Sequence, residues 1–409
     1  MPSLIPVVFV LTYVGMALGR VPGLRLDRTG IALLAAAILL GAGAVDTAFI
    51  GRAADAPTLL LLFALMVVSA QLGHSGFYAA CAQWIVVSRL GPHGLLALTV
   101  AVAGVLSAVL VNDIVVFAMT PLLVAGLSRR GLDPRPFLIG LAGASNAGSA
   151  ATVIGNPQNI LIAQVGQLDF WSFVAVCAPP ASVALAIVYA AVAVQWRREL
   201  AIVNRVTVDA APPEGDRQQV AKGLVATAAI LIWFSLGLPR EIGALAVAAL
   251  LLASRKVASR TILSAVDWHL LVLFACLFVV TAALAETGAG AAALAWLLEH
   301  GLWPDRLTVL APLALALSNT IGNVPAVVLI TAFWTDAGPG ALLSLSLLST
   351  LAGNFLLVGS IANLIVAERA AAAGVRLGFA DFARAGIPMT LVSMAVAVAW
   401  LLATGQLGL

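Results

Sequence analysis

Long apolar stretches recur along this chain, and they constrain its fold more than any other feature. Clear examples are residues 3–19, 31–45, 58–72 and 170–194. A helix that crosses the roughly 30 Å hydrocarbon core of a bilayer needs about 20 mostly apolar residues. Charged residues make up only 10% of the chain, against about 25% in soluble domains. Because backbone in lipid must satisfy its own hydrogen bonds, we expect an all-α polytopic membrane protein.

The basic residues predict an orientation in the membrane. We expect ten full spans, near residues 3–19, 30–46, 58–73, 137–165, 170–195, 222–239, 241–254, 266–285, 340–366 and 387–405, and two re-entrant hairpins at residues 94–128 and 306–335. With the loop after the first span in the cytoplasm, 18 of the 21 Lys and Arg residues fall inside, and only Arg52, Arg240 and Arg306 fall outside. This bias weakens if either hairpin crosses the membrane twice. We therefore expect a multi-pass protein of the bacterial inner membrane with both termini outside the cytoplasm.

Polar, helix-breaking sequence interrupts the apolar runs at four places, which form two pairs. Ser107 and Asn112 match Ser318 and Asn323 at an offset of 211, and Gly155 and Asn159 match Gly359 and Asn363 at an offset of 204. Matched interruptions in two halves of a membrane protein indicate the binding site of a transporter. Irregular backbone at membrane depth is tolerated only beside protein or water, so we expect the hairpin tips inside the protein.

The matched pairs divide the chain into two repeats. Residues 1–195 form the first repeat, with the hairpin at 94–128 and a broken helix at 137–165, and residues 222–409 form the second, with the hairpin at 306–335 and a broken helix at 340–366. Residues 196–221 are hydrophilic and are predicted to be a cytoplasmic linker. Each repeat has five transmembrane helices and one re-entrant hairpin. Since the first repeat begins outside and the second begins inside, the two are related by an inversion.

Asp113 is the only one of the 18 acidic residues that lies deep between hydrophobic segments. An ionised carboxylate at that depth is costly, so such residues usually face a cavity and mark ion or proton pathways. We predict that Asp113 carries a coupling proton. The alternative is a neutral Asp113 that is hydrogen-bonded to the hairpin backbone.

Polar side chains around the four interruptions are the predicted substrate or ion ligands. An amide at a hairpin tip offers one acceptor and two donors, although it can also cap a broken helix. The predicted set is Ser107, Asn112, Asn146, Ser149, Thr152, Gly155, Asn156, Asn159, Ser318, Asn319, Thr320, Gly322, Asn323, Gly359, Ser360 and Asn363. A plain kink at Pro157 is the alternative there, but it would need none of these polar neighbours. If sodium binds, the predicted ligands are hairpin carbonyls with Asn112, Asn156, Ser318 and Asn323.

Other classes of function find little support in the sequence. The net charge of +3 comes from basic residues in loops, which is typical of a membrane protein and does not indicate a nucleic-acid partner. The three cysteines show no metal-binding spacing. There is no Walker motif for ATP, and no His, Asp and Glu cluster that would support an intramembrane enzyme. A passive channel would not need two hairpins that open from opposite sides. We expect no cofactor other than a coupling proton or sodium ion.

These motifs resemble those of the ion transporter superfamily, which includes arsenite permeases, related sodium/proton antiporters and divalent anion–sodium symporters. The resemblance covers nearly the whole chain. Two motifs look like the hairpin motifs of arsenite permeases: Asn112-Asp113 with Thr120-Pro121, and Asn323-Val324-Pro325. Ser318-Asn319-Thr320 spells a motif of dicarboxylate symporters. Residues 150–159 look most like plant silicon efflux transporters. The first hairpin departs from the symporters, because it has Val111-Asn112-Asp113 where they have a second Ser-Asn-Thr.

The resemblance implies a homodimer and an elevator mechanism, in which a mobile part with both hairpins and both broken helices moves past a scaffold. It also implies that protons are exchanged for an uncharged metalloid acid or its oxyanion. We therefore predict proton-coupled efflux of a small inorganic acid such as arsenite or silicic acid. The alternative is a sodium-coupled carrier, either a sodium/proton antiporter or a sodium–dicarboxylate symporter. No basic residue falls in the expected core, which favours a neutral acid over a strongly anionic substrate.

Overall fold

The computed structural model describes residues 4–19, 23–24, 26–201, 215–288 and 298–409. The helices of the first half are α1 (Leu4–Leu18), α2 (Arg28–Gly41), α3 (Thr47–Ala53), α4 (Ala56–His74), α5 (Phe77–Val87), α6 (Pro92–Val109), α7 (Asn112–Arg129), α8 (Arg135–Ser149), α9 (Pro157–Val165), α10 (Phe170–Gln195) and α11 (Arg197–Leu200). Helix α5 falls in none of the predicted spans, because its apolar run is short.

The helices of the second half are α12 (Arg217–Ser235), α13 (Arg240–Leu252), α14 (Ser259–Leu263), α15 (Trp268–Glu286), α17 (Leu307–Thr320), α18 (Asn323–Phe333), α19 (Pro339–Ala352), the short 3-10 helix η1 (Leu357–Gly359), α20 (Ile361–Ala372) and α21 (Phe379–Ala403). Helix α12 begins before the predicted residue 222. Helix α21 begins before the predicted residue 387 and continues through Pro388. Most of the predicted linker, residues 202–214, lies outside the described residues.

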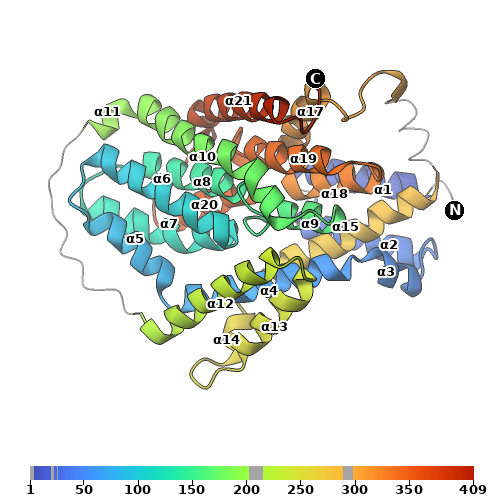
Figure 1. The fold of residues 1–409 in the computed structure, drawn as a ribbon, viewed down its shortest axis with the longest axis horizontal. Helices are drawn as coiled ribbons and strands as arrows, with labels where there is room; N and C mark the ends of the chain where they lie inside the picture. Colours follow the sequence, from blue (N-terminus) through green and yellow to red (C-terminus); the bar gives the residue numbers. More distant parts are fainter. Residues whose placement is uncertain (1–3, 20–22, 25, 202–214, 289–297) are drawn as a thin grey trace.

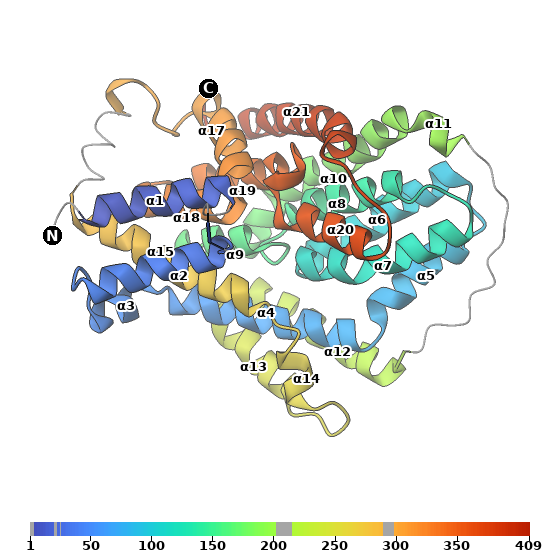
Figure 2. The same cartoon turned by 180° about the vertical axis from the view of Figure 1, so that it is seen from behind.

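The described part of the chain is helical and contains no β-strand. Within it, α4, α6, α7, α10, α15 and α21 are long and apolar enough to cross a membrane. The prediction of an all-helical, multi-pass membrane protein is therefore confirmed. Helices α4, α12, α13 and α14 lie along one edge of the molecule, and α10 and α21 lie along the opposite edge (Figures 1 and 2). The interrupted helices lie between these two edges.

Local sequence explains why the helices stop at the polar interruptions. Pro157 occupies the first turn of α9, where its missing N–H costs nothing, and Asn156 caps that helix by accepting a hydrogen bond from the Asn159 N–H. Between α17 and α18, Gly322 has a φ of +98°, a conformation that other residues rarely adopt. The backbone therefore turns at these residues, and a new helix begins immediately after each of them.

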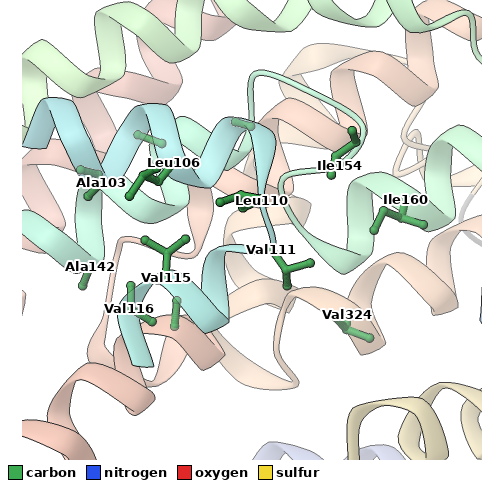
Figure 3. Close-up of a cluster of buried hydrophobic side chains, with 14 of the residues drawn as sticks. Ala103, Leu106, Leu110, Val111, Val115, Val116, Ala142, Ile154, Ile160 and Val324 are labelled. Atoms are coloured by element: carbon green, nitrogen blue, oxygen red, sulfur yellow. The ribbon is translucent and has the colours of Figure 1, made fainter. Parts of the chain in front are cut away.

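The interruptions pack against one another in the interior. Leu110 and Val111, which join α6 to α7, share a buried apolar cluster with Ile154 from the α8–α9 connection and Val324 from the start of α18 (Figure 3). The Asn112 N–H donates a hydrogen bond of 3.1 Å to the Gly155 carbonyl oxygen. This packing brings the ends of several helices to one place in the protein.

Candidate substrate site

A cavity of about 30 Å³ lies where the interrupted helices meet. It is lined by Arg28, Asn112, Asp113, Asn146, Pro157, Gln158, Leu273, Gly322, Asn323, Val324, Pro325, Ser360 and Ile361. A water molecule needs roughly 10–15 Å³ by this measure, so in this conformation the space fits one or two waters or a single small ion. Residues that are far apart in the sequence, from both halves of the chain, meet at this cavity.

Four helices begin at the cavity wall. Asn112 is the first residue of α7, Pro157 of α9, Asn323 of α18 and Ile361 of α20. The first N–H groups of a helix lack partners within the helix, and the helix dipole makes this end partly positive. Together the four helix starts favour a ligand that carries oxygen atoms with partial or full negative charge.

Two matched asparagines carry side-chain oxygens without partners. Asn112 is 4% exposed and Asn323 is 8% exposed. The Oδ1 atoms of both residues are buried and accept no hydrogen bond from any described residue. A buried carbonyl oxygen without a donor is unfavourable by about 1–3 kcal/mol. Since both residues line the cavity, these oxygens are available for a ligand that donates hydrogen bonds or for a cation.

Asp113 connects this cavity to a larger one. It lines the small cavity and also a second cavity of about 470 Å³, whose wall includes His74 and Asp267. Among the described residues the carboxyl group of Asp113 forms no hydrogen bond and no ion pair within 4.0 Å, so the structure does not show the alternative of a carboxyl group bonded to the hairpin backbone. Asp113 therefore lies between two cavities, and the larger one has room for water.

Arg28 is a cavity residue that the sequence analysis missed. It begins α2, and its Nε donates a hydrogen bond of 3.3 Å to the Met16 carbonyl oxygen. A Cβ atom added at Gly322 would lie 3.0 Å from Nη1 of Arg28, so the guanidinium lies against the tip of the second hairpin. The expectation of a core without basic residues was therefore wrong. Arg28 stands at the end of a predicted span, and only the tertiary packing brings it to the cavity.

Asn146 organises the polar side of the cavity. Its Nδ2 donates to Oδ1 of Asn354 at 2.8 Å and to Oδ1 of Asn363 at 3.0 Å. Its Oδ1 accepts hydrogen bonds from Oγ of Ser360 at 3.0 Å and, more weakly, from Nδ2 of Asn112 at 3.5 Å. The sequence analysis did not name Asn354 or the cavity residue Gln158, although both stand beside predicted interruptions.

The matched residues Asn159 and Asn363 lie behind the cavity and hold the broken helices together. Asn159 Nδ2 donates to the carbonyl oxygens of Ser149 and Thr152, and Asn363 Nδ2 donates to those of Gly353 and Leu356. Each acceptor in the second half lies 204 residues after its counterpart in the first half, as do the two asparagines. These side chains therefore make equivalent bonds within the two broken helices.

Most other predicted ligands also use their polar atoms inside the protein. Ser107 donates to Oγ of Ser145, Ser149 to the Asn146 carbonyl oxygen, Thr152 to that of Ala108, Ser318 to that of Ser349, Asn319 to that of Ala352, and Thr320 to that of Ala316. Backbone or side-chain oxygens lie too close to Gly155 and Gly359 to leave room for a Cβ. Of the four predicted sodium ligands, only Asn112 and Asn323 line the cavity; Asn156 caps α9, and Ser318 is turned toward α19.

Comparison with known proteins identifies the family. Residues 8–342, most of the chain, match the family described as CitMHS, citrate transporter. This chain belongs to the CitMHS citrate transporter family. The CitMHS chain is 30% identical over 401 residues to the uncharacterized transporter Rv2685 of Mycobacterium tuberculosis (strain ATCC 25618 / H37Rv), covering 92% of this chain and 94% of that protein. It is 27% identical over 462 residues to the silicon efflux transporter LSI3 of Oryza sativa subsp. japonica, covering 92% and 93% of the two chains.

Among solved structures, this CitMHS chain is similar to the YdaH transporter of Alcanivorax borkumensis, with a TM-score of 0.56 and coverage of 98% and 97%. Their sequences are 14% identical, so the likeness concerns the fold. The predicted kinship with the ion transporter superfamily, including silicon efflux transporters, is confirmed by the family match and by LSI3. The chain is a membrane transporter and not an enzyme.

The cavity of this CitMHS transporter offers both hydrogen-bond donors and acceptors. The Arg28 guanidinium and the N–H groups at the four helix starts donate hydrogen bonds, and their positive charge attracts negatively charged oxygens. The free Oδ1 atoms of Asn112 and Asn323 accept, as does an ionised Asp113. A ligand that satisfies both sets must itself donate and accept hydrogen bonds within a few ångströms.

Proposed function

We propose that this protein is a proton-coupled secondary transporter that exports a small hydroxylated inorganic acid, such as silicic or arsenous acid, or its oxyanion. One observation carries the proposal: Asn112 and Asn323, whose side-chain oxygens are buried without partners among the described residues, line the same cavity as Arg28. The hydroxyl groups of such an acid would donate to the two asparagines. Its oxygens would accept from Arg28 and from the helix starts.

The charge of the cavity favours this ligand over a bare cation, and a small acid needs less widening of the cavity than citrate does. Citrate carries three carboxyl groups and is much larger than a cavity of about 30 Å³, so it would require a wide rearrangement. A bare cation would be repelled by Arg28 and by the positive helix ends. The printed name of LSI3, silicon efflux transporter, agrees with a small tetrahedral acid. A compact molecule with several hydroxyl groups fits both the donors and the acceptors.

Alternating access by an inverted repeat would explain the arrangement of the helices. Helices α4 and α15 have 19 residues each, and their caps, Asp55 and Asp267, stand 212 residues apart. Helix α2 packs on α15, and α13 packs on α4, so corresponding helices make corresponding contacts. We infer an elevator in which both hairpins and both broken helices move together, in a homodimer of the bacterial inner membrane whose termini lie outside the cytoplasm.

Asp113 would couple the movement to protons. An ionised Asp113 could accept a hydrogen bond from a hydroxyl group of the neutral acid, whereas a proton on Asp113 would take the place of that hydrogen bond. The cavity of about 470 Å³ beside Asp113 would supply the path by which the proton enters or leaves. Proton binding and acid binding would then exclude one another at a single carboxyl group, as exchange of the acid for a proton requires.

Sodium coupling is the second candidate, and one observation favours it. The free Oδ1 atoms of Asn112 and Asn323 are the kind of oxygen ligands that a hard cation prefers. In that case the bound sodium would offset the charge of an anion held by Arg28. The coupling ion would then be sodium, alone or in exchange for a proton, and the transported species an anion.

Flux measurements in proteoliposomes distinguish these candidates. The purified protein is reconstituted with silicic acid, arsenite, antimonite, citrate or a dicarboxylate, with a pH gradient in sodium-free buffer. We expect the pH gradient to drive accumulation of silicic acid or arsenite, and we expect Asp113→Asn to lose this response while retaining exchange. Strict dependence on sodium, or transport of citrate alone, would refute the proposal. If the substrate never accumulates against its concentration gradient, the flux is passive, which would indicate a channel.

A further inference from the structure

Two arginines occupy corresponding positions in the two halves. Arg28 is the first residue of α2, and Arg240 is the first residue of α13, 212 residues later. The same offset relates α4 to α15, against which α13 and α2 pack. Arg28 and Arg240 therefore stand at equivalent places in the two repeats, and the predicted topology places them at opposite faces of the membrane.

In this structure the two arginines make different contacts. Arg28 lies at the tip of the second hairpin and lines the substrate cavity. Arg240 instead holds the end of α9: its Nη1 donates to the Ala163 carbonyl oxygen at 2.9 Å, and its Nη2 donates to that of Leu168. A cationic side chain on the carbonyl end of a helix is a stabilising arrangement, because it satisfies orphan acceptors.

The two arginines are expected to differ in this way if the two repeats exchange conformations during transport, as the proposed alternating access requires. Ala163 and Leu168 correspond to Ala367 and Ala372 at the offset of 204, and Gly322 corresponds to Val111 at the offset of 211. In the opposite conformation, Arg28 would therefore bind the last turn of α20. Arg240 would lie at the tip of the first hairpin, beside Asn112.

We propose that Arg28 and Arg240 alternate in two roles, one supplying positive charge to the substrate cavity while the other clamps the end of a broken helix. This inference rests on the alternating access proposed above and goes beyond it, because it assigns a substrate-facing role to Arg240, which is far from the cavity here. Each arginine would contact the substrate only when the site faces that arginine's side of the membrane.

The end of α20 carries a carboxylate, Glu368, and a basic residue, Arg369, whose guanidinium lies over the Phe117 ring. Next to the Arg240 clamp, Nε2 of Gln164 donates to Oε2 of Glu241 at 3.1 Å. The residue that corresponds to Gln164 in α20 is Glu368, which is exposed and forms no ion pair within 4.0 Å among the described residues. Glu368 thus lies near the carbonyl oxygens that the Arg28 guanidinium would contact, as Gln164 lies near those that Arg240 contacts. Among the described residues, the side chain of Arg28 forms a single hydrogen bond, to the Met16 carbonyl oxygen, so few contacts must break when it moves.

Cysteine cross-linking in active proteoliposomes tests the exchange. In a variant with Cys81, Cys177 and Cys276 replaced by serine, one pair, Arg240→Cys with Leu168→Cys, reports the contact seen here. A second pair, Arg28→Cys with Ala372→Cys, reports the opposite conformation. A short bifunctional thiol reagent spans the length of the replaced arginine. The control pair, Arg28→Cys with Leu168→Cys, joins residues that meet in neither conformation.

We expect each test pair to cross-link in its own variant and the control pair to remain free. Adding Arg240→Ala to the second pair should raise its cross-linking rate at least threefold, because the competing clamp is removed, whereas Arg255→Ala should not. Absence of the second cross-link under conditions in which the first pair cross-links would overturn the inference. Cross-linking reports conformation alone. Its result therefore does not depend on whether the proposed substrate is right, and the two proposals can fail separately.

Discussion

The replacement of Asn323 by leucine separates a binding role from a structural one. Oδ1 of Asn323 is buried and accepts no hydrogen bond from any described residue. Such a group destabilises the fold by about 1–3 kcal/mol relative to a satisfied one. Leucine has nearly the same shape and no polar atom, so Asn323→Leu should leave the free energy of unfolding unchanged or slightly increased. The same change should remove one hydrogen bond to the substrate.

The expected loss in binding follows from the energy of that bond. A neutral hydrogen bond contributes about 0.5–1.5 kcal/mol, so substrate affinity should fall about 2- to 12-fold. The assay combines thermal unfolding of the purified protein, with and without silicic acid or arsenite, and flux in proteoliposomes. The ligand should stabilise Asn323→Leu less than it stabilises the unmodified protein, and the KM for transport should rise.

Asn363→Leu provides the matched control. Asn363 is the same residue type in the same half, but its Nδ2 donates at 2.8 Å and 3.2 Å to the carbonyl oxygens of Gly353 and Leu356. Leucine there would leave both carbonyls without that donor, at a cost of about 1–3 kcal/mol for each group left unpaired. If Asn323→Leu destabilises the protein as much as Asn363→Leu does, or leaves the KM unchanged, the assignment of the free oxygen to substrate binding is wrong.

Three further outcomes are expected. Gly155→Ala should lower the unfolding temperature markedly, with a cost of about 1–3 kcal/mol or more, because its Cβ would lie 2.3 Å from a backbone carbonyl oxygen, whereas Gly51→Ala in an open position should not. Asp113→Asn should abolish proton-driven accumulation, measured as loss of response to a pH gradient, while isotope or tracer exchange persists. Arg28→Ala should weaken binding of an oxyanion more than that of its neutral acid, which titrations on either side of the acid's own ionisation would measure; equal weakening of both forms would contradict a charge role for Arg28.

Sequence periodicity and matched breakers predicted where the helices are interrupted. Gly322 and Pro157 act locally, through a positive φ and a missing N–H, so their effect can be read from sequence. The direction of a side chain cannot be read in this way. Asn159 and Asn323 are both matched polar residues beside an interruption, yet one bonds to the backbone of its own broken helix and the other faces the cavity. Only tertiary structure separates them.

Arg28 shows a different limit of the sequence. Its place at the end of a span made it one of many basic residues that follow the charge bias of the membrane, and this bias is a property of loops. Its contact with the cavity depends on how α2 packs against α15 and on how close the second hairpin approaches. Helix α5 was missed for a related reason, since an apolar run of 11 residues does not distinguish a span from a buried helix.

The presence of Arg28 changes which form of the substrate the site can select. Without a basic residue, the free amide oxygens would favour a fully protonated acid. With Arg28 and Asp113 on the same cavity, the charge of the site depends on whether Asp113 is ionised. An ionised Asp113 would offset Arg28, so that the neutral acid fits best; a protonated Asp113 would leave net positive charge, so that the oxyanion fits better. Protonation of Asp113 would therefore alter which form of the substrate binds best, in addition to coupling the proton to the conformational change.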